Sequence, residues 1–396
     1  MHEPSPTLGD VIRRFGAALQ ARHGEAMTAA QKAVLWALGR CHTAALGGHL
    51  YRCDSCGAEH IAYNSCRSRH CPSCLAHKSA QWLEARADEL LPVPYFHVVF
   101  TVPQQIASVV WGNKKLGYEI LFRAAAHTLL QIARDPRHLG AQIGFLAILH
   151  TWTQTLLYHP HIHCVVPGGG LSPDRTRWIG CRDNFFLPVK VLSRLFRGKF
   201  LALLDAAAKR GALRFAGSTA SLADPRAWTC LLRQMHRKDW VVYAKPPFGS
   251  PEQVLKYLAR YTHRVAISNR RIASLTDEYV TFRYHDRAHG NAIREMKLDG
   301  VEFLRRFLLH VLPKGFVRIR HFGLLANRAR ETNLAVCRSL LGATPAPRRD
   351  PMQTPDYDQP AICPTCQTGR LRLIATLDPS VPSQPHREPL PPPDTS

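Results

Sequence analysis

Three histidines at alternate positions are the residues of this sequence whose spacing first points to chemistry. Residues 157–170 read LYHPHIHCVVPGGG and contain His159, His161 and His163. In a β-strand, side chains two residues apart point to the same face of the sheet. Because Ile162, Cys164 and Val166 on the other face look like core, the segment predicts a strand that presents imidazoles, which are common metal ligands. The pattern alone leaves open whether these histidines bind metal or serve as structural residues.

A cysteine-rich run predicts a structural zinc site. The run YRCDSCGAEHIAYNSCRSRHCPSC, residues 51–74, holds two CxxC pairs separated by fourteen residues. A CxxC turn brings two thiolates to one metal ion, and two such turns close a tetrahedral site that has no open position. We therefore expect one zinc ion bound by Cys53, Cys56, Cys71 and Cys74. The alternative is that these are reduced cysteines of the core.

Further cysteines and histidines extend this prediction. Four residues beside the zinc run are candidates for a second zinc site: Cys41, His49, Cys66 and His70. Near the other end of the chain, Cys363 and Cys366 form a third CxxC without a following pair. The remaining ligands of that half knuckle are not identifiable from the sequence.

Two tyrosines four residues apart are candidate nucleophiles. In GSPEQVLKYLARYTHRVAIS, Ser250, Pro251 and Gln253 predict the start of a helix. Residues four apart lie on one helical face, so Tyr257 and Tyr261 share that face beside the apolar stripe. A packed structural tyrosine pair is the alternative interpretation.

The charge of the chain indicates a polyanionic partner. Its 396 residues include 52 Lys and Arg against 29 Asp and Glu, a net charge of +23. Basic charge of this size favours a nucleic-acid partner, where neutralised phosphates release counterions, and the alternative is a merely basic soluble protein. Taken singly, each basic residue could equally be a solvated surface residue. The candidate DNA contacts are Arg67, Arg69, Lys245, Arg260, Arg264, Arg305, Arg306, Arg318 and Arg320.

The hydrophobic pattern also indicates where the protein works. No apolar run approaches the roughly 20 residues of a membrane helix, and the first residues lack a secretory segment. We therefore expect a cytoplasmic, nucleoid-associated protein without a membrane partner. In a reducing compartment, the twelve cysteines are better interpreted as ligands and core residues than as disulfides.

The elements that must position these residues form an α+β fold. Apolar spacings of three and four predict helices near 7–45, 76–91, 113–134, 188–209 and 250–263. Alternating or β-branched segments predict strands at YFHVVFTVP, at IGFLAILHTW and near 264–285, with the second pairing antiparallel to the histidine strand. We expect a helical zinc-binding module at 1–92 and a catalytic domain with a central antiparallel sheet flanked by helices at 93–342. A Pro-rich, disordered tail with the half knuckle is expected at 343–396.

The combination of these motifs resembles one family: the two-tyrosine HUH transposases of rolling-circle insertion sequences, with their N-terminal transposase zinc-binding domain. The resemblance covers most of the chain, from CHTAALGGHLYRC and NSCRSRHCPSC through YFHVVFTVP, HPHIHCVVPGGGLS and YAKPPFG to YLARYTHRVAIS and FLRRFLLHVLPKGFVRIRHFG. It implies that His161 and His163 bind a catalytic Mg²⁺ or Mn²⁺ and that Tyr257 and Tyr261 are the nucleophiles. His159 and His150 are the nearest candidates for a third metal ligand.

The resemblance also implies a reaction. It is the cleavage and rejoining of single-stranded or hairpin DNA at element ends, and its joining to target DNA, through a 5′-phosphotyrosine intermediate. A rolling-circle replication initiator or relaxase would use the same chemistry, and a non-catalytic zinc-containing nucleic-acid-binding protein would use none of it. The zinc module and the later FLRRFLLHVLPKGFVRIRHFG segment favour the transposase.

Overall fold

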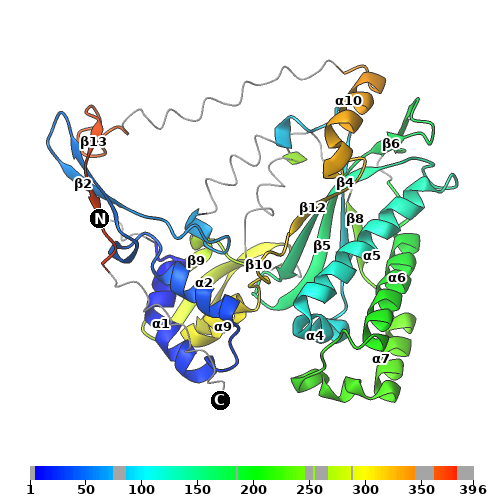
Figure 1. The fold of residues 1–396 in the computed structure, drawn as a ribbon, viewed down its shortest axis with the longest axis horizontal. Helices are drawn as coiled ribbons and strands as arrows, with labels where there is room; N and C mark the ends of the chain where they lie inside the picture. Colours follow the sequence, from blue (N-terminus) through cyan, green and yellow to red (C-terminus); the bar gives the residue numbers. More distant parts are fainter. Residues whose placement is uncertain are drawn as a thin grey trace, which may run out of the picture.

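A central antiparallel sheet of five strands organises the protein. The computed structural model describes residues 5–74, 86–183, 186–245, 253–254, 266–286, 289–343 and 361–380. The strand order is β12-β4-β5-β3-β8 (Figure 1). The strands are β3 (Tyr95–Thr101), β4 (Gly144–Trp152), β5 (Tyr158–Pro167), β8 (Val242–Lys245) and β12 (Ile319–Gly323). The predicted α+β class and the predicted antiparallel pairing of β4 with the histidine strand β5 are confirmed.

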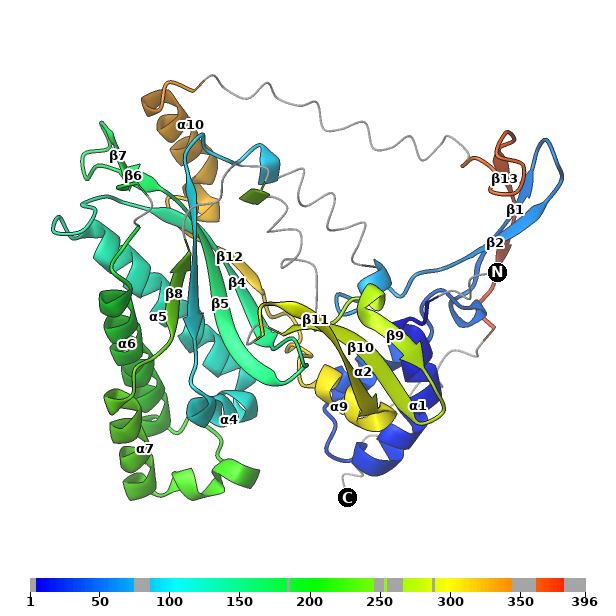
Figure 2. The same cartoon turned by 180° about the vertical axis from the view of Figure 1, so that it is seen from behind.

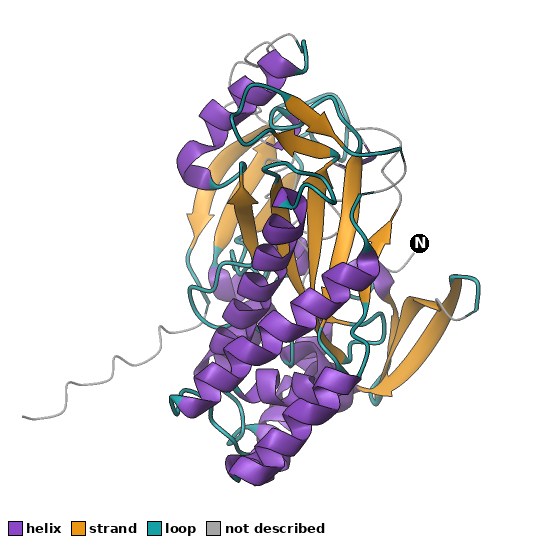
Figure 3. Cartoon of the chain, turned by 90° about the vertical axis from the view of Figure 1, so that its right-hand side faces the viewer, coloured by secondary structure: helices purple, strands orange, loops and turns teal. Residues whose placement is uncertain are grey.

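Long helices cover one face of this sheet (Figure 3). They are α4 (Gln104–Gly112), α5 (Lys114–Arg134) and α6 (Val189–Lys209), and α7 (Pro225–Arg237) packs on α6. Alternate strand residues such as Phe100, Leu149 and Ile162 point to these helices and pack against Leu121 and Phe196 in the largest hydrophobic core. Burying this apolar face is the main force that holds the helices on the sheet.

The N-terminal helices pack against a second sheet rather than against the zinc run alone. Helices α1 (Leu8–His23) and α2 (Ala29–Gly39) share a core with β9 (Ile272–Leu275), β10 (Tyr279–Asp286) and α9 (Gly300–Leu308), and β11 (Ala292–Asp299) completes that sheet (Figure 2). A Cβ on Gly300 would clash with the ring of Phe15, so α9 and α1 approach closely at this point. These contacts cross the boundary predicted after residue 92.

A third sheet joins the two ends of the chain. Strands β1 (Gly48–Cys53) and β2 (Glu59–Tyr63) form a hairpin, and β13 (Leu371–Leu377) pairs antiparallel with the other edge of β1 (Figure 1). Within the predicted C-terminal tail, residues 361–380 are therefore structured. The Pro-rich stretches 344–360 and 381–396 lie outside the described residues.

The remaining described elements are short or peripheral. They are the β6 (Gly169–Leu171) and β7 (Trp178–Gly180) hairpin, helix α10 (Arg330–Leu340) and the 3₁₀ turns η1 (Ala44–Leu46), η2 (Gly217–Ala223), η3 (Asn269–Arg271) and η4 (Asn327–Ala329). Most of the helices predicted at 76–91 and 250–263 falls outside the described residues. Among the described helices, none is long and apolar enough to cross a membrane.

Candidate functional site

Three histidines converge on the sheet face opposite the long helices. In the register of β4 and β5, His150 lies directly across from His161, and Ile148 lies across from His163. All three imidazoles therefore share one face, and their ligand nitrogens lie within 4.8 Å of one another. The ring centroid of His163 lies 4.3 Å from that of His150 and 4.8 Å from that of His161. We call His150, His161 and His163 the histidine cluster.

Hydrogen bonds determine which nitrogens face one another in this cluster. His161 Nδ1 lies 2.6 Å from the carbonyl oxygen of His159, which can only accept, so Nδ1 carries the proton and Nε2 keeps its lone pair. His163 Nδ1 lies 2.8 Å from His97 Nε2, and this contact directs the opposite nitrogen of His163 into the cluster. Fixing the second imidazole nitrogen in this way is the usual device that orients metal-binding histidines.

The sequence left two candidates for a third ligand, and the structure distinguishes them. His150 is a member of the cluster, whereas His159 contributes its backbone carbonyl and has its ring 5.4 Å from that of His161. His97 was missed by the sequence interpretation. The alternation of β3 could have identified it. Residues 97, 99 and 101 of β3 point to the same sheet face as His161 and His163, so His97 lies on the histidine face.

The surroundings of the cluster exclude much of the solvent. His150 is 2% exposed and His163 is 6% exposed, while His161 is half-buried. Trp152 stacks on His150 with ring centroids 4.5 Å apart.

Tyr257 and Tyr261 lie outside the described residues, but the start of their segment is described. Residues 253–254 are helical, and Val254 is fully buried. Val254 packs in a small apolar cluster with Ile148 and Val165, which lie on the same sheet face as the histidine cluster. The tyrosine-bearing segment therefore begins on the histidine face of the sheet.

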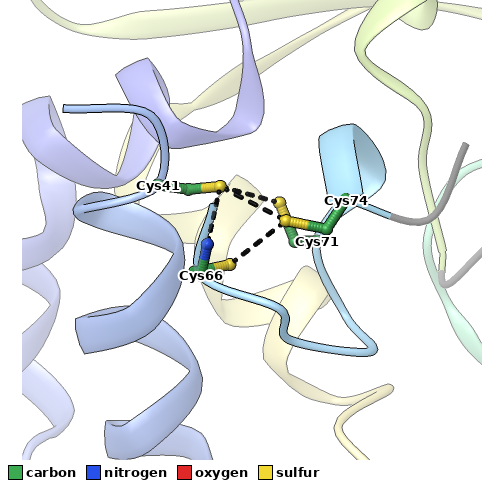
Figure 4. Close-up of side chains that lie close together, drawn as sticks. All are labelled: Cys41, Cys66, Cys71 and Cys74. Carbon is green, nitrogen blue, oxygen red and sulfur yellow. Dashed lines mark hydrogen bonds between the residues drawn. The ribbon is translucent and has the colours of Figure 1, made fainter. Parts of the chain in front are cut away.

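Cysteines form a first cluster beside the N-terminal helices (Figure 4). The sulfur of Cys41 lies 3.5 Å from those of Cys71 and Cys74, and Cys66 Sγ lies 3.7 Å from Cys74 Sγ. A tetrahedral zinc ion with Zn–S bonds of about 2.3 Å separates its sulfurs by roughly 3.8 Å. The first cysteine cluster, Cys41, Cys66, Cys71 and Cys74, therefore fits structural zinc.

The predicted pairing of the two CxxC turns in one site is corrected by this geometry. Cys53 and Cys56 lie instead with Cys363 and Cys366, as a second cysteine cluster whose sulfurs also lie within 4.8 Å of one another. The predicted second site is also corrected. Cys41 and Cys66 belong to the first cluster, but His49 and His70 join neither, and His70 Nε2 accepts the backbone N–H of Leu312 at 3.3 Å.

The β1–β2 hairpin is the physical reason for this correction. Cys53 and Cys56 form its tip, whereas Cys66 follows its base, where His42 N–H donates to the Asn64 carbonyl at 3.1 Å. The six residues of β1 span roughly 16–20 Å at about 3.3 Å per residue. The two CxxC turns are therefore too far apart to share one metal ion.

Several candidate DNA-contact arginines have partners within the protein. Arg320 binds Glu119 through two hydrogen bonds of 2.6 Å and stacks on Phe122, on the sheet face opposite the histidine cluster. Arg305 and Arg306 both pair with Glu302. Arg69 donates to the carbonyls of Pro313 and Phe316, and burial beside Arg69 lowers the pKa of Arg318 to about 10.

The remaining candidate DNA-contact residues are Arg67, Lys245, Arg260 and Arg264. Arg67 is exposed on the loop after Cys66. Arg260 and Arg264, like the side chain of Lys245, lie outside the described part of the chain.

Comparisons with known proteins agree with the motifs. The family model described as "Putative transposase" matches residues 144–333, and the "Transposase zinc-binding domain" model matches residues 11–102. The chain is 51% identical over 387 residues to "Putative transposase y4qJ" of Sinorhizobium fredii, covering 96% of this chain and 97% of that protein. It is 30% identical over 315 residues to the "Transposase for insertion sequence element IS801" of Pseudomonas savastanoi pv. phaseolicola, covering 78% and 73% respectively. No solved structure gives a significant match. The chain therefore belongs to the IS91/IS801 family of insertion-sequence transposases.

Proposed function

We propose that this transposase is a metal-dependent HUH endonuclease and strand transferase that cleaves and rejoins single-stranded DNA at the ends of its element. The observation that carries the proposal is the convergence of His150, His161 and His163 on one sheet face, with their ligand nitrogens within 4.8 Å of one another. Two of these rings have their Nδ1 atoms engaged by His97 and by the His159 carbonyl. Both therefore turn Nε2 toward a common point.

The donor set indicates which ions the site accepts. A divalent cation bound there would polarise the scissile phosphate and neutralise the charge that develops as the phosphodiester is attacked. Mg²⁺ prefers oxygen ligands, whereas imidazole suits softer ions. Three imidazoles therefore favour Mn²⁺ over Mg²⁺ as the more effective ion, and water and phosphate oxygens would complete its coordination.

Tyr257 and Tyr261 are the nucleophiles in this proposal. The phenol oxygen attacks the phosphorus as it loses its proton, the bond from phosphorus to the 3′-oxygen breaks, and that oxygen takes up a proton. The products are a 5′-phosphotyrosine and a free 3′-hydroxyl. Attack by a 3′-hydroxyl on the phosphotyrosine reverses the step, so strands are rejoined without ATP. The burial of Val254 on the histidine face supports this role, because Tyr257 follows three residues later in the sequence.

Two tyrosines allow two strand transfers, one to release the element strand and one to join it to target DNA. The net charge of +23 supports binding of single-stranded or hairpin DNA. Arg67, Lys245, Arg260 and Arg264 are the first candidates for these contacts. Such an enzyme would work at the nucleoid in the cytoplasm.

The test is incubation of the full chain with labelled single-stranded DNA that carries an element end. With Mn²⁺, we expect a covalent protein–DNA species on denaturing gels and release of the strand that ends in a 3′-hydroxyl. Chelation should stop the reaction, and added Mn²⁺ should restore it. A product with a 5′-phosphate and no covalent species would indicate hydrolysis and would contradict the proposal.

A further inference from the structure

The second cysteine cluster joins residues from opposite ends of the chain. Cys53 Sγ lies 3.6 Å from Cys366 Sγ, and Cys56 Sγ lies 3.8 Å from Cys363 Sγ. These separations match the roughly 3.8 Å expected between sulfurs on one tetrahedral zinc ion. They are far longer than the S–S bond of about 2.05 Å in a disulfide, and all four are free thiols.

The two CxxC turns of this cluster have the same local backbone. The residue after each second cysteine has a left-handed conformation, with φ of 73° at Gly57 and 59° at Gln367. In both turns that residue donates its N–H to the carbonyl of the first cysteine, at 3.1 Å for Cys53 and 2.9 Å for Cys363. Each turn therefore directs its two thiols to the same side, as a metal knuckle requires.

N–H groups surround the sulfurs. The backbone N–H groups of Ser55 and Cys56 donate to Cys53 Sγ at 3.4 Å, and that of Gly369 donates to Cys366 Sγ at 3.3 Å. His60 Nε2 on β2 lies 3.6 Å from Cys363 Sγ. Donors around a ligating sulfur stabilise its negative charge and orient it toward a metal ion.

The backbone around the cluster allows the Cys53–Cys56 turn and the Cys363–Cys366 turn to approach closely. A Cβ on Gly369 would clash with Cys53 Sγ and with the side chain of Ser55, so glycine permits this contact. The Asp54 carboxylate accepts the backbone N–H of Arg370 at 2.7 Å and pairs with Arg372 at 3.4 Å. From this point β13 runs along β1, with Cys53 opposite Leu371.

We propose that Cys53, Cys56, Cys363 and Cys366 bind a second zinc ion, completing a zinc ribbon whose two halves come from the two ends of the chain. The four thiolates leave no open position, so the ion is structural. The metal holds residues 361–380 on the N-terminal hairpin as the third strand of its sheet. This inference is independent of the proposed DNA chemistry, because none of these residues belongs to the histidine cluster.

The primary experiment counts metal ions in the full chain, purified under reducing conditions from zinc-containing medium. With the histidine cluster removed by His161→Ala/His163→Ala, so that its imidazoles add no zinc, we expect two zinc ions per chain and one when Cys363→Ser/Cys366→Ser is added. Cys230→Ser in the same background, which removes an exposed cysteine outside both clusters, should keep two and is the matched control. One zinc in the background chain, two after the Cys363/Cys366 substitutions, or iron in place of zinc would overturn the proposal.

Hydrogen exchange gives a readout that does not depend on metal analysis. In Cys363→Ser/Cys366→Ser, the β13 amides should lose protection while β4 and β5 remain unchanged. Cys53→Ser/Cys56→Ser should show the same pattern, since it removes the other half of the site. If the β13 amides of both double variants were as protected as those of the wild type, strand pairing alone would hold residues 361–380 on the hairpin. That result would contradict a role for zinc in holding this segment.

Discussion

The histidine cluster and the two cysteine clusters place ligands in opposite ways. The three histidines come from residues 150–163 on two adjacent strands of a sheet that has hydrophobic residues packed on both faces. Most of the cysteines lie on turns and loops, although Cys53 ends β1, and one cluster spans 313 residues between Cys53 and Cys366. A site on a regular sheet is positioned before metal binds, whereas a site on loops gains its order from the metal. Metal removal should therefore affect the two kinds of site differently.

The largest expected effect is on the first cysteine cluster. Cys71→Ser/Cys74→Ser should remove one zinc ion and the order of the loops around it, because structural zinc contributes about 10–16 kcal/mol of apparent binding free energy to folding. Helix α1 shares its core with Cys71, so its amides should also exchange faster. Zinc analysis and hydrogen exchange measure both effects, with Cys230→Ser as the control. Unchanged exchange in α1 would show that the N-terminal core does not need this zinc.

Removing the histidine cluster should abolish activity while leaving the fold and the zinc at the cysteine clusters intact. His161→Ala/His163→Ala should reduce DNA cleavage by about a thousandfold or more, because a catalytic metal supplies several kcal/mol of transition-state stabilisation. Zinc bound at the cysteine clusters should stay near wild type, and so should DNA binding, since binding draws on many phosphate contacts. His285→Ala, at an exposed histidine of β10, is the matched control. Cleavage at the wild-type rate with limiting Mn²⁺ would exclude the cluster as the metal site.

A smaller effect is expected at His97, which positions His163 through a 2.8 Å hydrogen bond. His97→Leu should weaken Mn²⁺ affinity by about 10–100-fold, the usual cost of losing a residue that orients a metal ligand. His97→Gln keeps an acceptor and should recover part of this loss. The measurement is the Mn²⁺ concentration that gives half-maximal cleavage. An equal loss in both variants would indicate a packing role for His97 rather than orientation of His163.

The same contrast explains what the sequence could predict. Alternation along β5 identified the shared face of His161 and His163, because the side-chain period of a strand is a local property. Which cysteines belong to which cluster depends on the position of the β1–β2 hairpin tip and on the distant segment that contacts this tip. No local pattern reports that β13 pairs with β1, so the partners of Cys363 and Cys366 required the structure.

The arginines give a similar lesson. The positive charge of the chain is visible in its composition, but the sequence does not show which charges are used internally. Arg320 meets Glu119 across 201 residues, and Arg69 reaches the Pro313 carbonyl across 244 residues. These arginines therefore stabilise tertiary contacts. Such internal partners cannot be recognised from the charge of the chain, which was the basis for predicting these arginines as DNA contacts.

The most direct measurement of the central claim is the covalent adduct formed by Tyr257→Phe, Tyr261→Phe and the double variant. Labelled single-stranded element-end DNA is incubated with each protein and Mn²⁺, and the products are separated on denaturing gels. Phenylalanine keeps the ring and removes only the attacking oxygen, so fold and zinc content should be preserved. We expect each single variant to retain partial adduct formation and the double variant to form none. An adduct that persists in the double variant would exclude these tyrosines as the nucleophiles and leave the histidine cluster without its proposed partner.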